Sequence, residues 1–335
     1  MGLLPTSSSQ FYGKLSDMNI LWPNNLAAVS AVELARRLES LTPGFSRLLS
    51  DRQLPIELKT ELARLYLPLA SWLAKQTRQT RPLIVGINGA QGSGKTTLCT
   101  LLAWLLGEGF GLRCCVLSLD DLYLTRSERL LLAKEIHPLL ETRGVPGTHD
   151  VALGLHLLDS LGATATDSIT PIPRFDKASD DRVPESAWDP FRGRPDLILF
   201  EGWCVGAQAQ PQAELAAAVN ALELDEDPSA VWRTYVNQQL GQGYRALFDR
   251  LDLLLMLKIP SWEMVYRWRS NQERLLAATS KGCGVMDAAQ LQRFIMHYER
   301  LTRYQLAEMP GRADLIFVLN QAQRVTQIIK KAASA

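Results

Sequence analysis

A glycine-rich stretch constrains the fold of this 335-residue chain more than any other feature, and it runs Gly89-Ala90-Gln91-Gly92-Ser93-Gly94-Lys95-Thr96. It fits the pattern G-x-x-x-x-G-K-[ST] at every fixed position. An apolar run at residues 83–88 precedes it, and a helical pattern beginning at Thr97 follows it. A strand, a turn and a helix in this order present backbone N–H groups and the positive end of the helix to an anion. We therefore predict a nucleotide-phosphate site made of Gly89, Ala90, Gln91, Gly92, Ser93, Gly94, Lys95, Thr96 and Thr97.

Short apolar runs alternate with amphipathic stretches from residue 83 onward. The apolar runs are residues 83–88, 114–119, 197–201, 251–259 and 315–319, and the helical patterns are residues 95–106, 151–161, 229–249, 262–279 and 287–309. Continuously apolar strands that alternate with helices indicate a parallel sheet buried on both faces. The expected fold class is α/β: the three-layer αβα sandwich of P-loop NTPases with a parallel five-stranded sheet. In such sheets the ligand lies at the carboxyl ends of the strands.

The first 80 residues differ from the rest, because they show only helical spacing of apolar side chains, at residues 26–41 and 55–75. Pro68 is expected to kink or divide the second stretch. We predict a helical N-terminal extension, residues 1–80, packed on a P-loop core domain, residues 81–335. Within the core, a substrate loop is expected at about residues 143–195 and a lid at about residues 262–282.

Net charge, apolar runs and cysteine content limit the kinds of partner and the cell compartment that we expect for this chain. Lys plus Arg is 36 and Asp plus Glu is 35, so the net charge is +1, which argues against broad nucleic-acid binding. The apolar run at residues 251–259 is interrupted by Asp252 and Lys258 and is too short to span a bilayer. The five cysteines form no C-x-x-C pair, which favours reduced thiols in a cytoplasmic protein. We expect a small-molecule substrate, with neither nucleic acid nor membrane as partner.

Acidic residues follow the second and third apolar runs. Asp120 and Asp121 come after residues 114–119, and Glu201 ends the run at residues 197–201. Beside a bound nucleotide, Asp120 can accept a proton from a hydroxyl nucleophile or bind Mg²⁺. The Thr96 hydroxyl and the Glu201 carboxylate are further Mg²⁺ ligands, while Lys95 reaches the β and γ phosphates of ATP.

Basic residues lie between these strands and after the fourth run. Arginine forks suit carboxylates, and several cations beside a phosphate site favour an acidic substrate. An arginine in the lid can stabilise transition-state charge on the phosphates, and we assign that role to Arg269. The candidate substrate residues are Tyr123, Arg143, His149, Arg174, Asp176, Lys177 and Arg182.

Taken in order, these segments resemble the plant-type glycerate kinases, within the P-loop kinase group that includes uridine kinase, phosphoribulokinase and bacterial pantothenate kinase. The narrower resemblance is carried by RGVPGTHD (143–150), PRFDK (173–177), FEGWCVG (200–206) and VYRWRSNQE (265–273). It implies phosphorylation of D-glycerate by ATP to 3-phosphoglycerate, with Asp120 as general base and Thr96 and Glu201 at the metal. Leu122 and Phe175 depart from the family, which usually has an aromatic residue and a tyrosine there, and both are expected to touch the acceptor pocket.

Two alternatives remain open at this level. A kinase of the same group could act on another hydroxyl, such as a nucleoside or a pantothenate-like alcohol, although the basic character of residues 174–182 favours an acid. A nucleotide-dependent regulator without turnover could use the same glycine-rich turn, because this turn and fold do not by themselves establish catalysis.

Overall fold

The computed structural model describes residues 21–23, 26, 30–163, 168–279 and 286–331. Its helices are α2 (Ala31–Asp51), α3 (Leu67–Gln76), α4 (Lys95–Phe110), α5 (Arg126–Glu135), α6 (Val151–Gly162), α7 (Ala221–Glu226), α8 (Val231–Gly241), α9 (Gly243–Phe248), α10 (Glu263–Thr279) and α11 (Ala288–Glu308). Its strands are β1 (Leu83–Gly89), β2 (Cys114–Ser118), β3 (Ile169–Ile172), β4 (Phe175–Asp176), β5 (Asp181–Arg182), β6 (Asp189–Arg192), β7 (Leu197–Gly202), β8 (Leu253–Lys258), β9 (Leu315–Leu319) and β10 (Val325–Lys330).

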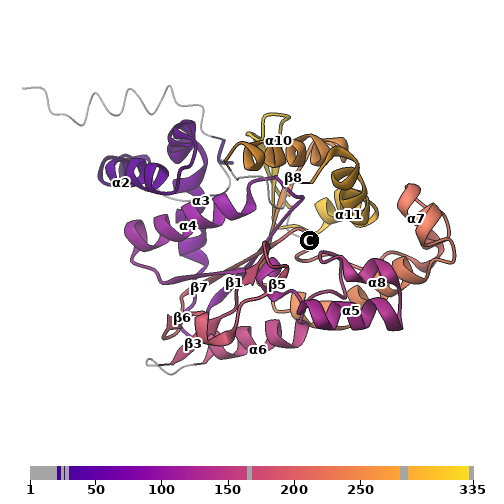
Figure 1. Cartoon of the computed structure of the whole chain (residues 1–335). Helices are drawn as coiled ribbons and strands as arrows, with labels where there is room; N and C mark the ends of the chain where they lie inside the picture. The colour runs from indigo at the N-terminus through magenta and orange to yellow at the C-terminus, as the bar shows by residue number, and fades with distance from the viewer. Residues whose placement is uncertain (1–20, 24–25, 27–29, 164–167, 280–285, 332–335) are drawn as a thin grey trace, which may run out of the picture.

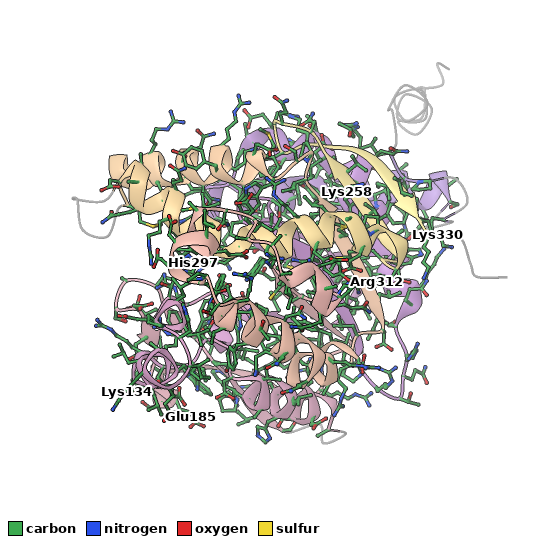
Figure 2. All side chains as sticks on the ribbon, turned by 90° about the vertical axis from the view of Figure 1, so that its right-hand side faces the viewer. Lys134, Glu185, Lys258, His297, Arg312 and Lys330 are labelled. Carbon is green, nitrogen blue, oxygen red and sulfur yellow. The ribbon has the colours of Figure 1, made fainter. Side chains whose placement is uncertain are left out.

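The central sheet has six strands in the order β10-β9-β8-β1-β7-β2. The five apolar runs form its parallel strands, as the sequence predicts. The sixth strand corrects the predicted number of five, because β10 pairs antiparallel with β9 at the edge. Its side chains are mostly exposed, with Ile328 buried, so β10 has no apolar run to mark it. Lys330 at its end lies at the rim of the molecule (Figure 2).

The order of the strands decides which helices cover which face. The connection from β1 to β2 crosses the sheet in one direction, while those from β2 to β7, β7 to β8 and β8 to β9 run in the other. Because such crossovers are right-handed, α4 lies on one face and the remaining crossover helices lie on the opposite face. Figure 1 shows this division, with α4 on one side of the sheet and α6, α8 and α11 on the other.

The N-terminal extension covers the face that α4 alone would leave open. α3 packs against α4, and α2 lies next to both (Figure 1). Leu65 and Tyr66 lie opposite Phe317 of β9 across a cavity. Residues 62–66 form a π-helical turn and α3 begins at Leu67, so the second predicted helical stretch is divided next to Pro68. α2 is longer than predicted and continues through Pro43 to Asp51.

Two further differences from the sequence prediction concern helices. The stretch 229–249 is two helices, since Gln242 leaves helical geometry between Gly241 and Gly243. α5 was not predicted, although Thr125 and Glu128 form a capping box at its start. Cys99, Cys114, Cys115 and Cys204 are free thiols, whereas Cys283 lies outside the described residues. None of the described helices is long and apolar enough to cross a bilayer.

Candidate active site

The glycine-rich turn links β1 to α4 as the sequence predicts. Gly92 and Gly94 have φ values of 76° and 91°, which side-chain-bearing residues rarely adopt. A Cβ at Gly92 would also lie 2.9 Å from the Cβ of Trp268 in α10. Lys95 donates a hydrogen bond from Nζ to the Ala90 carbonyl at 3.2 Å, so its ammonium folds back over the turn. The turn therefore has the curled backbone and the cation that a polyphosphate requires.

A cavity of about 220 Å³ opens beside this turn at the carboxyl ends of the strands. Its position is the one expected for a ligand site in a parallel sheet. It is lined by Gln91, Gly92, Lys95, Thr96, Asp120, Tyr123, Arg143, Lys177, Glu201, Trp203, Arg269, Gln272, Phe294 and Tyr298.

Glu201 sits at the end of β7, against the first turn of α4. Its side chain is 4 % exposed, and its Oε1 accepts a hydrogen bond from the Thr96 hydroxyl at 2.8 Å. The Ser118 hydroxyl, on the neighbouring strand β2, donates to the same oxygen at 3.3 Å. Within the described part of the chain, no group of three or more His, Cys, Asp or Glu side chains could hold a metal ion. Mg²⁺ needs only one or two carboxylates when phosphates and water supply the rest, so this hydroxyl and carboxylate fit it.

Asp120 lies in a 3₁₀ turn, Leu119–Leu122, directly after β2. Its carboxylate forms an ion pair with Lys177 Nζ at 2.7 Å and accepts a hydrogen bond from the Tyr123 hydroxyl at 2.9 Å. Burial alone would raise the pKa of Asp120, but the Lys177 ammonium, together with Lys95 and the Tyr123 hydroxyl, outweighs burial and lowers the pKa to about 2. Asp120 is therefore ionised at neutral pH.

Lys177 and Arg143 reach the cavity from two loops. Lys177 lies in the turn between β4 and β5, and Arg143 forms an ion pair with Asp180 of the same turn. The Arg143 carbonyl accepts a hydrogen bond from the Tyr298 hydroxyl at 3.1 Å. The next residue must be glycine, because Gly144 has a φ of 138° and a Cβ there would overlap Tyr298. The glycine in RGVPG thus lets α11 approach the loop that carries Arg143.

Arg269 extends from α10 over the opposite side of the cavity. It donates a hydrogen bond to Gln272 Oε1 at 3.0 Å and forms an ion pair with Glu273. Its guanidinium also lies 6.0 Å from the Phe294 ring centre. Residues 280–282 of the predicted lid lie outside the described residues.

No family model matches the chain. A curated protein from Schizosaccharomyces pombe, named "Uncharacterized kinase mug58", is 34% identical over 257 residues, covering 74% of this chain and 90% of that one. The chloroplastic D-glycerate 3-kinase of Arabidopsis thaliana is 29% identical over 267 residues, covering 75% of this chain and 56% of that one. The solved structure of D-glycerate 3-kinase from Cryptococcus neoformans superposes with a TM-score of 0.60 at 27% identity, covering 76% of this chain and 91% of that one. The chain belongs to the D-glycerate 3-kinase family.

As a member of that family, the chain is a P-loop kinase that transfers a phosphoryl group to an alcohol. Ten of its predicted site residues line the catalytic cavity and nine do not. Those that line the cavity are Gln91, Gly92, Lys95, Thr96, Asp120, Tyr123, Arg143, Lys177, Glu201 and Arg269. Gly89 and Ala90 are buried under the turn, while Ser93, Gly94 and Thr97 border a second cavity on its other side.

Four of the predicted substrate residues do not line the catalytic cavity but lie behind or beside it. His149 is buried, stacks on Tyr123 with ring centres 4.5 Å apart, and is hydrogen-bonded to the Tyr244 hydroxyl. Arg174 binds Asp121, and Arg182 binds Asp150 and the Tyr123 carbonyl. Asp176 is exposed and caps its own turn through Ser179. These four side chains are thus bonded to residues that form or support the wall of the cavity. Direct contact between them and the substrate stays a prediction.

The two departures from the family pattern differ in position. Leu122 is 2 % exposed in the main hydrophobic core and does not line the cavity, contrary to expectation. Phe175 also lies outside the lining and packs edge-on against Tyr123 at 5.2 Å, beneath the guanidinium of Arg143. Neither residue contacts the acceptor space directly.

Sequence reasoning missed an aromatic wall. Trp203, Phe294 and Tyr298 line the cavity, with Trp203 and Tyr298 packed edge to face at 4.9 Å. Gln272 lines it as well. Trp203 lies within FEGWCVG (200–206) and Gln272 within VYRWRSNQE (265–273). Phe294 and Tyr298 of α11 lie in a stretch whose sequence shows only helical spacing of apolar residues. α11 reaches the site through tertiary packing, since it contacts α10 and its Tyr298 packs against Trp203.

Proposed function

We propose that the chain is an ATP-dependent D-glycerate kinase that forms 3-phosphoglycerate. One observation carries the proposal: Lys95, Arg143, Lys177 and Arg269 surround the same cavity as the carboxylates of Asp120 and Glu201. This excess of cations suits two anionic substrates, a nucleotide polyphosphate and a small hydroxy acid. The names of the relatives from Arabidopsis and Cryptococcus support the choice of D-glycerate.

The nucleotide end of the site is the glycine-rich turn. Its backbone N–H groups and the start of α4 would bind the phosphates of ATP, and Lys95 would exchange the Ala90 carbonyl for the β and γ phosphates. The Thr96 hydroxyl and Glu201 would hold Mg²⁺, with Asp120 within reach directly or through water. When bound, the ion neutralises charge on the transferring phosphoryl group.

The acceptor end of the site is the Asp120–Lys177 pair. The substrate carboxylate would draw Lys177 away from Asp120, since an ammonium that is 61 % exposed can rearrange at little cost. Removal of that ammonium would let the pKa of Asp120 rise from about 2 toward its ordinary value. Substrate binding would thereby turn a weak base into a better one.

Transfer then follows from positions of this chain's own side chains. Asp120 would accept the proton of the acceptor hydroxyl as that oxygen bonds to the γ-phosphorus and the bond to ADP breaks. Arg143 and Lys177 would hold the carboxylate, and the Tyr123 hydroxyl would hold Asp120 in place. Arg269 would stabilise the charge that develops on the transferred group. His149, Arg174 and Arg182 would keep these groups in position from behind.

An acceptor screen tests this proposal. ADP release is measured with ATP and Mg²⁺ in the presence of D-glycerate, L-glycerate, uridine or pantothenate. We expect turnover with D-glycerate well above the rest. Turnover with uridine or pantothenate alone would replace the acceptor, and release with none of them would remove kinase activity on small alcohols. The expected cytoplasmic location stays a prediction, and the Arabidopsis relative is named as chloroplastic.

A further inference from the structure

Three aromatic side chains form one side of the catalytic cavity, whose volume is about 220 Å³. Trp203 directly follows β7, and Phe294 and Tyr298 belong to α11. We call these three residues the aromatic wall. Burial and the nearby Asp120 carboxylate raise the pKa of the Tyr298 hydroxyl, which puts the aromatic wall at the acceptor end of the cavity.

The aromatic wall is held firmly in place. Trp203 is 3 % exposed within the main hydrophobic core, and its Nε1 donates a hydrogen bond to the Gly144 carbonyl at 2.8 Å. Tyr298 is equally buried, and its hydroxyl donates to the Arg143 carbonyl. The two rings pack edge to face against each other. Because closely packed side chains yield little to an added group, this wall cannot move aside for a longer substrate.

The aromatic wall also has few hydrogen bonds to offer. The protons of Trp203 Nε1 and of the Tyr298 hydroxyl are both donated to backbone carbonyls, and the Phe294 side chain is apolar. D-Glycerate has three carbons, and the charged groups of the cavity are proposed to bind its carboxylate and its terminal hydroxyl. An additional CHOH group would lie against ring surfaces, where its hydroxyl would lose hydrogen bonds to water.

We propose that the aromatic wall, and Trp203 above all, limits the acceptor to hydroxy acids of three carbons. The inference rests on the proposed function, because it assumes that Arg143 and Lys177 bind the acceptor carboxylate. It makes Trp203 a residue that determines specificity by excluding longer sugar acids, with no part in the transfer of the phosphoryl group. A single methylene group in an apolar pocket changes specificity by about 10- to 200-fold, so such a wall can discriminate strongly.

Binding of two acids to the full chain tests the inference. Calorimetry is carried out with ADP and Mg²⁺ present, so that no phosphoryl transfer occurs. It compares D-glycerate with D-erythronate, which has one more CHOH group. We expect the wild-type chain to bind D-glycerate at least about 10-fold more tightly. Equal affinity for the two acids would overturn the inference.

The variant Trp203→Leu opens the aromatic wall and keeps it apolar. Both acids should bind more weakly, because the Gly144 carbonyl loses its donor, and the preference for D-glycerate should fall to within about threefold. The matched control Tyr298→Phe removes the bond to the neighbouring Arg143 carbonyl and keeps the ring. It should weaken both acids by a similar factor and retain the wild-type preference. A wild-type preference in Trp203→Leu, or the same loss of preference in Tyr298→Phe, would contradict the role of Trp203.

A second variant covers the case in which Trp203→Leu does not fold. Phe294→Ala removes a partly buried ring from the same wall. The preference for D-glycerate should then fall at least about threefold, because the added CHOH group gains space. An unchanged preference in Phe294→Ala would overturn the inference.

Turnover with ATP separates this inference from the proposed function. If D-glycerate binds selectively and is not phosphorylated, the proposed function fails and the size limit remains. If the wild-type chain phosphorylates D-glycerate and D-erythronate with equal kcat/KM, the glycerate kinase activity stands and the size limit fails. If neither acid binds, both proposals fail.

Discussion

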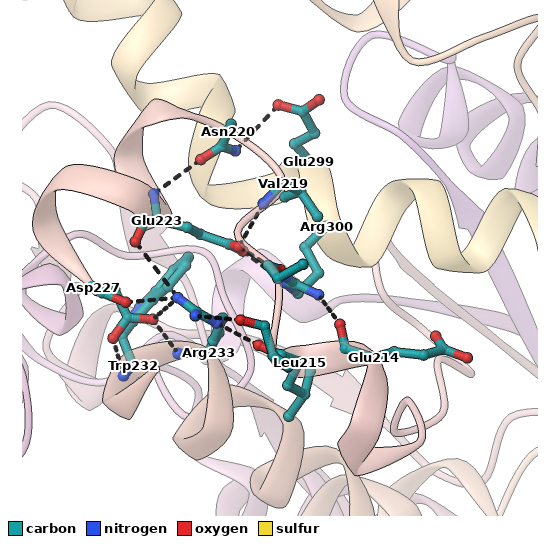
Figure 3. Close-up of polar contacts among 12 residues, drawn as sticks. Glu214, Leu215, Val219, Asn220, Glu223, Asp227, Trp232, Arg233, Glu299 and Arg300 are labelled. Atoms are coloured by element: carbon teal, nitrogen blue, oxygen red, sulfur yellow. Dashed lines mark hydrogen bonds and ion pairs between the residues drawn. The ribbon is translucent and has the colours of Figure 1, made fainter. Parts of the chain in front are cut away.

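The chain contains two clusters of opposite charges that look alike in composition and differ in how their hydrogen bonds are satisfied. One lines the catalytic cavity, and the other ties residues 212–233 to α11 (Figure 3). In the second cluster Arg233 is 4 % exposed, and it donates to Asp227 and to the carbonyls of Leu215 and Ala216. The N–H groups of its guanidinium are thus bonded to backbone carbonyls and to a carboxylate.

The carboxylates of this second cluster also have hydrogen-bond donors for both of their oxygens. Glu223 and Asp227 are each 1 % exposed. Glu223 binds the Arg300 guanidinium through both oxygens and also accepts from the Val219 N–H, while Asp227 accepts from the N–H groups of Trp232 and Arg233. A buried ionic network so completely bonded has no free bonding position for a ligand. We interpret it as a structural tie.

Three cations of the catalytic cavity are paired with carboxylates, one of which lines the cavity while two lie beside it. Lys177 neutralises Asp120, Asp180 neutralises Arg143, and Glu273 neutralises Arg269. The cation of each pair is at least partly exposed, so it can exchange its carboxylate for an anionic group of a substrate. A structural network thus differs from a reactive one in how completely its charged groups are hydrogen-bonded, more than in how deeply they are buried.

Replacing Asp120 should produce the largest effect. Asp120→Asn removes the proposed base and keeps the shape, so kcat with D-glycerate should fall about 10²–10⁴-fold while ADP affinity changes little. Steady-state ADP release and calorimetry measure the two quantities. Because the Lys177 ammonium is exposed, thermal stability should barely change. A kcat near the wild-type value would exclude Asp120 from the chemistry.

Replacing Arg233 should act on stability alone. Arg233→Met leaves Asp227 buried without its cation, so the free energy of unfolding should fall by about 3–5 kcal/mol. The matched control is Arg245→Met, which breaks an exposed pair with Asp249 and should change stability by less than about 1 kcal/mol. Urea titration measures both. If activity per folded molecule fell as strongly as stability, the two clusters would not be separate in function.

Replacing Lys177 should affect substrate binding. Lys177→Ala removes the cation proposed to bind the carboxylate, and the KM for D-glycerate should rise about 10- to 100-fold with the KM for ATP nearly unchanged. Arg324→Ala, a half-exposed cation outside the catalytic cavity, should leave the KM for D-glycerate unchanged. An unaltered KM for D-glycerate in Lys177→Ala would place the carboxylate elsewhere.

Acid should destabilise the region around the structural network through His297, which packs edge-on against Trp232. Burial lowers the pKa of His297 from 6.5 to about 4. Between these values the unfolded chain binds a proton that the folded chain does not, so stability falls as pH decreases from about 6.5 to 4. His297→Phe should reduce this slope by up to about 1.4 kcal/mol per pH unit, measured by urea titration. A slope in His297→Phe equal to that of the wild-type chain would contradict the assignment.

Much of the fold is predictable because its strands are buried on both faces and therefore appear as apolar runs. β10 is not, since an edge strand with mostly exposed side chains gives no such run. The second cavity is not predictable either, because its walls come from residues 55–66, Leu257 and Phe317, which only the packing of the extension brings together.

The candidate active site is likewise predictable from the sequence only in part. Lys95, Thr96, Asp120 and Glu201 were predictable as neighbours because they follow parallel strands whose carboxyl ends meet. The basic residues of the long loop were not, because the path of a loop decides which cation faces the cavity. Lys177 lies in the hairpin turn and reaches it, whereas Arg174 and Arg182, in the same segment, bind Asp121 and Asp150 behind it.

The most direct test is a crystal structure of the full chain with Mg²⁺, a non-hydrolysable ATP analogue and D-glycerate. We expect the triphosphate on the glycine-rich turn, the glycerate carboxylate within hydrogen-bond distance of Lys177 or Arg143, and the terminal hydroxyl of glycerate beside Asp120. Glycerate bound away from Asp120, or a triphosphate bound away from Lys95, would contradict it.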